Sequence, residues 1–297
     1  MTARREPPVI QLLVTDLDNT LWDWFTAWHR SFSSMLASLE ELSGVPASAL
    51  EKETKTVHQR RKTTEYSMLL NELPSLKAIS GSLAPLKVFD EAIHVLNSER
   101  LRATALYPGV KSTLEILKRG SVPVVAYSES LAYWTEWRIR KTGLDGLIDV
   151  LYTSPDHDLP ADVSIEDIRT LPPDDYGLRS TEHRHVPRGI IKPNPVVLHE
   201  ILEDYGIDAR SVAYVGDSLM KDVAMAKDVG VHDVHAAYGV VQHKEEYSLL
   251  RRVSHWSQED VERERRLVEQ PAIQATHELH HGFGELLQFF QFEAASR

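Results

Sequence analysis

The sequence of 297 residues contains no cysteine. Disulfide bonds, thiolate zinc sites and catalysis by a cysteine nucleophile are therefore excluded, and cysteine usage leaves the redox compartment open. Long hydrophobic runs are missing as well, because no stretch approaches the ~20 apolar residues of a membrane span. No apolar segment of signal-peptide length follows Arg4 and Arg5. We therefore expect a soluble, cytoplasmic protein.

Positive charge is in short supply, with 33 Lys and Arg against 44 Asp and Glu, and a formal net charge of −11. Proteins that bind the nucleic-acid backbone or anionic membranes are more often basic, so we expect neither partner. An acidic protein that handles an anionic substrate needs a local cation or a metal ion. Hydrophobic residues (42%) and charged residues (26%) occur at ordinary globular frequencies, which excludes disordered and fibrous classes.

Two widespread catalytic motifs are also missing. The sequence has no GxxxxGK[ST] phosphate loop, which excludes a P-loop ATPase. It has no GxSxG nucleophile elbow either. The chemistry of the protein must therefore come from other side chains.

Apolar, β-branched runs alternate with helical patterns along much of the chain. Five runs are typical of buried parallel strands: 9–14, 122–127, 147–152, 212–215 and 231–236. Helical periodicity fills the intervals at 109–118, 131–141, 196–205 and 219–229. This alternation predicts an α/β fold, a doubly wound, Rossmann-like parallel sheet that is covered on both faces.

Three segments do not belong to this alternation. Residues 21–105 keep a helical period throughout, which predicts a helical cap inserted after the first strand. Residues 153–188 are polar and acidic and exceed the length of an ordinary loop, so they form an insertion within the core. Residues 241–297 are predicted to be a C-terminal helical extension. The core itself comprises residues 1–20 and 106–240.

Carboxylate and hydroxyl side chains follow the ends of the predicted strands. Asp16 and Asp18 come after the first strand, Ser128 after the second and Asp217 after the fourth. In a doubly wound sheet, ligands bind outside the carboxyl ends of the strands, so these side chains converge on one edge.

Lys192 and Asp222 complete this predicted cluster. Lys192 precedes the helix that leads to the fourth strand, and Asp222 lies about one turn after Asp217. Several carboxylates in one crevice repel each other, and a divalent cation relieves that repulsion. Oxygen-only ligands favour Mg²⁺.

The cluster suits the hydrolysis of a phosphate monoester. Asp16 would attack phosphorus as a nucleophile and divide the reaction into two steps through an acyl phosphate. Asp18 would give a proton to the departing oxygen and later take one from water. Mg²⁺ and Lys192 would neutralise the charge of the phosphoryl group.

Four short motifs occur in order along the chain: Asp16-Leu17-Asp18-Asn19-Thr20, Ser128, Lys192-Pro193-Asn194-Pro195, and Gly216-Asp217 with Asp222. They resemble the DxDxT, Ser, KPxP and GDxxxxD motifs of the haloacid dehalogenase (HAD)-like hydrolase superfamily, phosphatase type. The insertion at 21–105 resembles the helical (type 1) cap of that family. The resemblance covers the core and leaves the cap and the C-terminal tail unexplained.

The resemblance implies a role for each motif residue. Asp16 is implied as nucleophile and metal ligand, and Asp18 as acid/base and as metal ligand through its backbone carbonyl. Thr20 is implied to position the site, Ser128 and Lys192 to bind the phosphate, Asp217 to bind the metal and Asp222 to support it. The implied cofactor is Mg²⁺.

The predicted function is Mg²⁺-dependent hydrolysis of a small phosphate monoester. Dehalogenases of this family do not need the second aspartate, so Asp18 favours phosphoryl transfer. Two alternatives stay open: a phosphomutase acting on a phosphosugar, and a non-catalytic regulatory or binding protein that retains the core. Glu129 stands where the family often has Asn or a small residue, so it either faces away from the site or alters substrate choice. The sequence predicts no oligomeric state.

Overall fold

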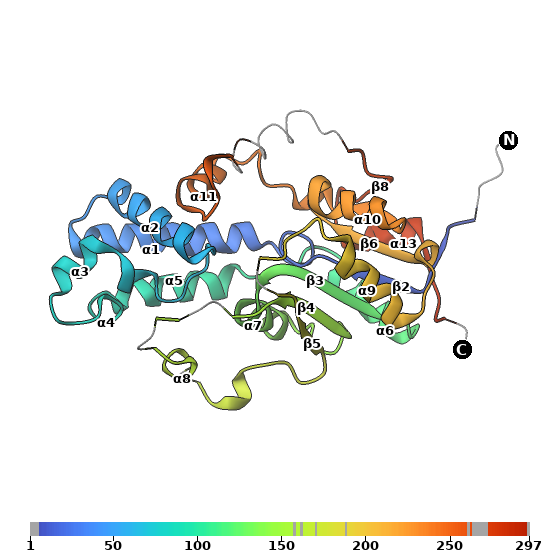
Figure 1. Cartoon of the computed structure of the whole chain (residues 1–297), viewed down its shortest axis with the longest axis horizontal. Helices are drawn as coiled ribbons and strands as arrows, with labels where there is room; N and C mark the ends of the chain where they lie inside the picture. Colours follow the sequence, from blue (N-terminus) through green and yellow to red (C-terminus); the bar gives the residue numbers. More distant parts are fainter. Residues whose placement is uncertain are drawn as a thin grey trace.

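The computed structural model describes residues 6–156, 159–160, 163–169, 171–187, 189–259, 262 and 273–295. Its centre is a sheet of seven parallel strands in the order β5-β4-β3-β2-β6-β7-β8 (Figure 1). The strands are β2 (Leu12–Thr15), β3 (Val124–Leu131), β4 (Val150–Ser154), β5 (Glu182–His185), β6 (Val212–Gly216), β7 (His232–His235) and β8 (His277–Glu278). The predicted parallel α/β core is confirmed.

Helices cover both faces of this sheet, because alternate residues of each strand point to opposite sides. In β2, Leu13 packs in one apolar layer with α6 (Val110–Arg119) and α7 (Ala132–Thr142). Leu12 and Val14 pack in the other layer with α9 (Pro195–Tyr205) and α10 (Ala224–Val229). A strand that is buried on both faces needs a continuous apolar run, which explains the pattern at the start of the chain.

A second, helical body, which we call the cap, lies beside the sheet and is formed largely by residues 24–103 (Figure 1). It contains α1 (Trp24–Ser43), α2 (Ala47–Arg61), η1 (Leu69–Glu72), α3 (Pro74–Ser80), α4 (Pro85–Val88) and α5 (Asp90–Ala103). The side chain of Asp23 caps the start of α1 by accepting from the Thr26 amide, and Gly44 ends it in the left-handed conformation. The apolar stripe of α1, which includes Phe25, Phe32 and Leu39, faces the cap interior.

The C-terminal segment adds one further helix to the cap. Helix α11 (Tyr247–Val253) places Leu250 and Val253 in the same apolar cluster as Val57 of α2. The Nδ1 atom of His58 lies 2.7 Å from the Val253 carbonyl. Figure 1 shows the chain leaving the sheet, reaching the cap at α11 and returning to the sheet at β8.

Several predicted elements differ from the structure. The C-terminal extension is not only helical: beside α11 and α13 (Leu286–Phe289) it contributes β8 and the short strand β9 (Gln291–Phe292), which pairs with β1 (Val9–Ile10). Strands of two residues are too short to show an alternating pattern, and 263–272 lie outside the described part of the chain.

The insertion at 153–188 also contains more structure than its composition indicated. It holds the short helix α8 (Ile165–Ile168) and the edge strand β5. An edge strand is only half covered, so its polar sequence Glu-His-Arg-His gave no apolar signal. In addition, β3 runs three residues past Ser128, which the sequence placed at the strand end.

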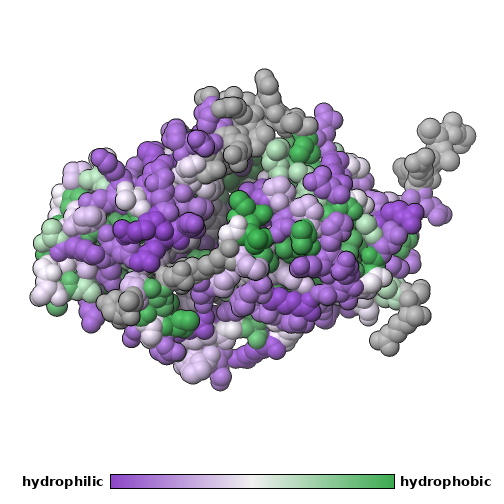
Figure 2. Space-filling model, in the orientation of Figure 1, coloured by the Kyte–Doolittle hydropathy of each residue, from purple (hydrophilic) through white to green (hydrophobic). Residues whose placement is uncertain are grey.

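The visible face of the molecule is largely hydrophilic, with small scattered hydrophobic patches (Figure 2). Among the helices of the described residues, none combines the length and the apolar character that a membrane span requires.

Candidate active site

Three neighbouring strands end at one edge of the sheet and bring the first and fourth motifs together. Thr15 of β2 pairs with Ala126 of β3 and with Val215 of β6. The Asp16 amide then donates to the Val215 carbonyl at 2.8 Å, which continues the ladder one residue past β2. The residues after Val215 therefore lie beside Asp16, as the parallel register requires.

A buried lysine joins two of the carboxylates. Lys192 is only 3% exposed, and its Nζ donates to Asp16 Oδ1 at 2.5 Å and to Asp222 Oδ1 at 2.9 Å. Asp222 also accepts from the Tyr214 hydroxyl at 3.0 Å and from the Ser218 amide at 3.1 Å. Both oxygens of Asp222 are thus engaged by protein donors, and its contacts hold Lys192 against Asp16.

Burial makes this cluster electrostatically costly. Burial raises the pKa of Asp16 to about 7, although the ammonium of Lys192 opposes the shift. Burial also raises the pKa of Asp217 well above its ordinary value, and the charge of Asp16 adds to the effect. For Lys192, burial alone would lower the pKa, but Asp16 and Asp222 hold it well above its usual range. One ammonium group does not balance three carboxylates.

The carboxylates fit a divalent cation. One oxygen each from Asp16, Asp217 and Asp222 lies within 4.8 Å of the others. The set is made of oxygen atoms alone, which is the chemistry that hard divalent cations prefer. Gly216 makes the approach possible, because a Cβ at this position would lie 2.2 Å from Asp222 Cγ.

The carboxylate of Asp18 belongs to a different set of contacts. It accepts from Trp22 Nε1 at 2.6 Å and from the Ser130 hydroxyl, and its Oδ1 lies 3.7 Å from Arg138 Nη1. The side chain of Asp18 therefore stands apart from the three clustered carboxylates. The family resemblance implies that the backbone carbonyl of Asp18, and not this carboxylate, is the metal ligand.

The turn after Asp16 is fixed by short contacts from distant parts of the chain. Thr20 Oγ1 donates to Asp16 Oδ2 at 3.1 Å, and the Thr20 carbonyl accepts from the Tyr238 hydroxyl at 2.6 Å. Asn19 adopts a positive φ of 58°, and its side chain accepts from the Phe25 amide. A Cβ on Gly239 would lie 1.8 Å from the Asn19 carbonyl oxygen, so only glycine permits this approach.

Ser128 and Glu129 lie on the neighbouring strand. Ser128 is buried, and its Oγ accepts from the Ser130 amide at 3.1 Å. Glu129 Oε1 accepts from the Lys192 amide at 2.9 Å, and its Oε2 accepts from Lys221 Nζ at 2.5 Å. Glu129 thus binds the loop that carries Lys192 and is paired with the ammonium group of Lys221.

The sequence did not indicate several residues that contact the predicted ones. Tyr214 and Ser130 each lie two residues from a motif residue, so the alternation along a strand could have found them. Arg138 lies within α7 and Glu65 in a cap loop. Neither position carries a motif, and only the three-dimensional structure shows that Arg138 lies next to both Asp18 and Glu65.

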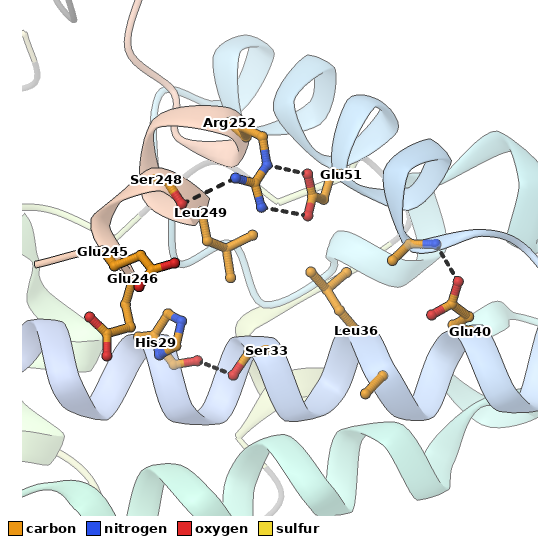
Figure 3. Close-up of a pocket in the computed structure, with 12 residues that line it drawn as sticks. His29, Ser33, Leu36, Glu40, Glu51, Glu245, Glu246, Ser248, Leu249 and Arg252 are labelled. Carbon is orange, nitrogen blue, oxygen red and sulfur yellow. Dashed lines mark hydrogen bonds and ion pairs between the residues drawn. The ribbon is translucent and has the colours of Figure 1, made fainter.

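A separate cavity of about 420 Å³ lies in the cap between α1, α2 and α11 (Figure 3). Its lining includes His29, Glu245 and Glu246, together with the ion pair between Arg252 and Glu51. None of the predicted site residues lines this cavity. The predicted site residues therefore lie outside this cavity.

Comparison with known proteins gives a family and a fold. The family model of haloacid dehalogenase-like hydrolases matches residues 10–230. A 2-haloacid dehalogenase from Pseudomonas syringae pv. Tomato DC3000 superposes with a TM-score of 0.54 at 20% identity, covering 94% of this chain and 97% of that chain. A putative beta-phosphoglucomutase from Thermotoga maritima gives 0.50 at 15% identity, with the same coverage of 94% and 97%. No curated protein matches the chain. At such identities the structural likeness shows a shared fold.

Proposed function

Because the chain belongs to the haloacid dehalogenase-like hydrolase family, we propose that it hydrolyses a small phosphate monoester through a phosphoryl group carried by Asp16. The observation that supports this proposal is that two nearby aspartates have different contacts. Asp16 lies against Lys192 and Thr20, while Asp18 is held two residues away by other donors. A nucleophile and a separate acid are what the two steps of the reaction require.

In the first step, a carboxylate oxygen of Asp16 forms a bond to phosphorus. The bond between phosphorus and the oxygen of the leaving group breaks, and Asp18 gives its proton to that oxygen. The products are an alcohol and an acyl phosphate on Asp16. In the second step, water attacks the same phosphorus, Asp18 takes a proton from the water, and phosphate leaves as the Asp16 carboxylate is restored.

The negative charge of the phosphoryl group needs a cation on two sides. Lys192 would supply one, since its ammonium already contacts Asp16. Mg²⁺ would be held by Asp16, Asp217 and the Asp18 carbonyl, and it would neutralise phosphoryl oxygens as a Lewis acid. Asp222 would support that site by fixing Lys192. Ser128, buried on the adjacent strand, would donate to the phosphate.

The cap favours a small substrate over a protein. Residues 21–105 form a body beside the sheet edge, and the Glu65 carboxylate, which accepts from Trp24 within this body, pairs with Arg138 of the core helix α7. A covered site excludes bulk water during transfer. We propose that closure of the cap over the sheet edge forms the substrate site.

The test is phosphate release from a panel of phosphomonoesters, with and without Mg²⁺, by the wild type and the Asp16→Asn variant. The proposal predicts metal-dependent release that the variant loses. Isomerisation of a phosphosugar with little free phosphate would instead indicate a phosphomutase. A folded, Mg²⁺-binding protein with no turnover on any substrate would indicate a non-catalytic role.

A further inference from the structure

Two buried arginines lie at the seam between the cap and the core, and one of them, Arg138, lies close to Asp18. Arg138 is on the core helix α7 and is 3% exposed. Arg100 is in the last turn of the cap helix α5 and is 8% exposed. Buried arginines are rare unless an anion accompanies them, so their partners show what else the seam can hold.

Arg138 uses only part of its guanidinium. Its Nη2 pairs with the Glu65 carboxylate, which also accepts from Trp24 Nε1 at 3.1 Å. Its Nη1 is fully buried but has no hydrogen-bond partner among the described residues, and it lies 3.7 Å from Asp18 Oδ1. Two of the arginine's five N–H donors are thus left for an acceptor beside Asp18.

Arg100 has no carboxylate of its own. Its guanidinium carbon lies 4.1 Å above the ring of Trp134, and within the described part of the chain no hydrogen bond links the guanidinium to a carboxylate. Burial lowers the pKa of Arg100 to about 10, while the charge of Glu65 opposes that shift. The group therefore stays charged at neutral pH. Glu65 is the one anion that both arginines share within the described residues.

The position of Arg138 beside Asp18 relates it to the leaving-group half of the substrate. In the proposed reaction Asp18 gives its proton to the leaving-group oxygen, so the leaving group must contact Asp18. Groups a few bonds from that oxygen then come within reach of Arg138 Nη1. A guanidinium recognises carboxylate and phosphate oxygens with two parallel hydrogen bonds, and burial strengthens such charged bonds.

We propose that Arg138 and Arg100 bind a second anionic group, a carboxylate or a phosphate, on the leaving-group half of the substrate. This inference rests on the proposed phosphatase function and names the class of its substrate: a phosphomonoester of a small alcohol that itself carries a negative charge. Arg138 lies next to Asp18, whereas Lys192 contacts Asp16 and Asp222, so the subsite is made of other groups than those that hold the transferred phosphoryl.

The experiment compares matched substrates on the full chain with Mg²⁺. 3-Phosphoglycerate and glycerol 1-phosphate differ by a carboxylate, and 1,3-propanediol bisphosphate offers a phosphate instead. We expect kcat/KM to be about tenfold or more higher for at least one of the two substrates with a second anionic group than for glycerol 1-phosphate, mainly through KM. Whichever charged substrate is preferred identifies the anion. Equal kcat/KM for all three substrates would overturn the proposal.

Substitutions of Arg100 and Arg138 test whether these residues cause the preference for a second anionic group. Arg100→Met is expected to reduce the ratio of kcat/KM between substrates with and without the second anionic group by about tenfold, and Arg100→Lys by less, because it keeps the charge. Arg138→Lys provides a second test that retains a buried cation. The control is Arg102→Met, an exposed arginine of the same helix that pairs with Glu99. An unchanged ratio in Arg100→Met and Arg138→Lys would contradict the assignment.

Binding separates this inference from the proposed reaction. In the Asp16→Asn background, calorimetry should show tighter binding of 3-phosphoglycerate or the bisphosphate than of glycerol 1-phosphate. Addition of Arg100→Met should remove the difference. If that pattern occurs without turnover by the wild type, the anion subsite stands and the phosphatase function fails. If turnover occurs with no such difference in binding, the subsite fails and the phosphatase function stands.

Discussion

The sheet edge and the cap of this protein are organised by different kinds of contact. At the sheet edge, polar groups from β2, β6 and the loop of Lys192 meet through hydrogen bonds and through glycines that permit close approach. The cap is held by apolar packing, and part of that packing comes from α11, almost 200 residues along the chain from α2. Short sequence motifs therefore predict the sheet edge. The cap instead depends on the contact between α2 and α11, which no local sequence pattern predicts.

The first prediction tests whether Asp16 and Asp18 have different roles in the reaction. Asp18→Asn removes the proton donor but leaves Asp16, Lys192 and Asp222 in contact. We expect kcat to fall by about 10²–10⁴-fold, because this is the usual contribution of a general acid. Steady-state phosphate release measures the change, with the exposed Asp228→Asn as the matched control. A fall of less than tenfold would assign the proton transfer to another group.

The second prediction concerns the glycine contact at the catalytic turn. Gly239→Ala places a Cβ against the Asn19 carbonyl, and the backbone on both sides must move. We expect a loss of about 3 kcal/mol in the free energy of unfolding, because overpacking against backbone is not easily relieved. The urea midpoint of unfolding measures the loss.

Gly120→Ala is the control for that prediction. Gly120 has a right-handed helical conformation, and its Cβ would meet the nearest backbone atom at 3.4 Å. We expect it to change the stability by less than about 1 kcal/mol. Equal midpoints for the two variants would show that the turn does not depend on close approach at Gly239.

The third prediction tests whether α11 is part of the cap core. Leu250 is 1% exposed and packs in the cap cluster, so Leu250→Ala should cost about 2–5 kcal/mol. Leu114→Ala, in the core helix α6, should cost a similar amount, whereas Leu101→Ala, at a half-exposed position, should cost far less. Thermal unfolding of the three variants provides the comparison. A small loss for Leu250→Ala would make α11 peripheral to the cap.

The fourth prediction concerns pH. The pKa of Asp16 is about 7 in the folded chain and near 3.8 when the group is exposed. Between these values the folded state binds the extra proton, so the stability of the metal-free wild type should fall as the pH rises from about 4 to 7. The Asp16→Asn variant has no carboxyl group at this position, so it does not lose stability in this way. Its stability relative to the wild type should rise over that window by on the order of 1 kcal/mol or more.

Denaturation in a chelator at pH 5 and pH 8 measures this difference. Addition of Mg²⁺ at pH 8 should stabilise the wild type more than the variant, because the ion binds the ionised carboxylate. A difference that is the same at both pH values would mean that Asp16 is ionised in the fold without a metal.

The sequence predicted the sheet and its polar edge for a physical reason. Parallel strands that are buried on both faces need continuous apolar runs, and their carboxyl ends coincide, so Asp16, Ser128 and Asp217 could be placed together before the structure was known. Lys192 could be added because its motif stands before the helix that leads into β6.

Other features could not be predicted in this way. Arg138, which lies next to Asp18, comes from a helix interior, and its partner Glu65 comes from a cap loop, so neither follows a pattern of spacing. Strand β5 lies at the edge of the sheet, so its residues did not need to be apolar. Helix α11 has an apolar face, but nothing local shows that α2 covers it. These contacts depend on the tertiary arrangement.

The most direct test of the account is to find the transferred phosphoryl group on the protein. A single turnover of an accepted substrate is quenched in acid within milliseconds, the chain is cleaved, and the peptide that contains Asp16 is examined by mass spectrometry. The account predicts the added mass of one phosphoryl group on Asp16, and its absence from the Asp16→Asn variant. Turnover with no phosphorylated peptide, or with the phosphoryl group on another residue, would contradict the role of Asp16 as nucleophile.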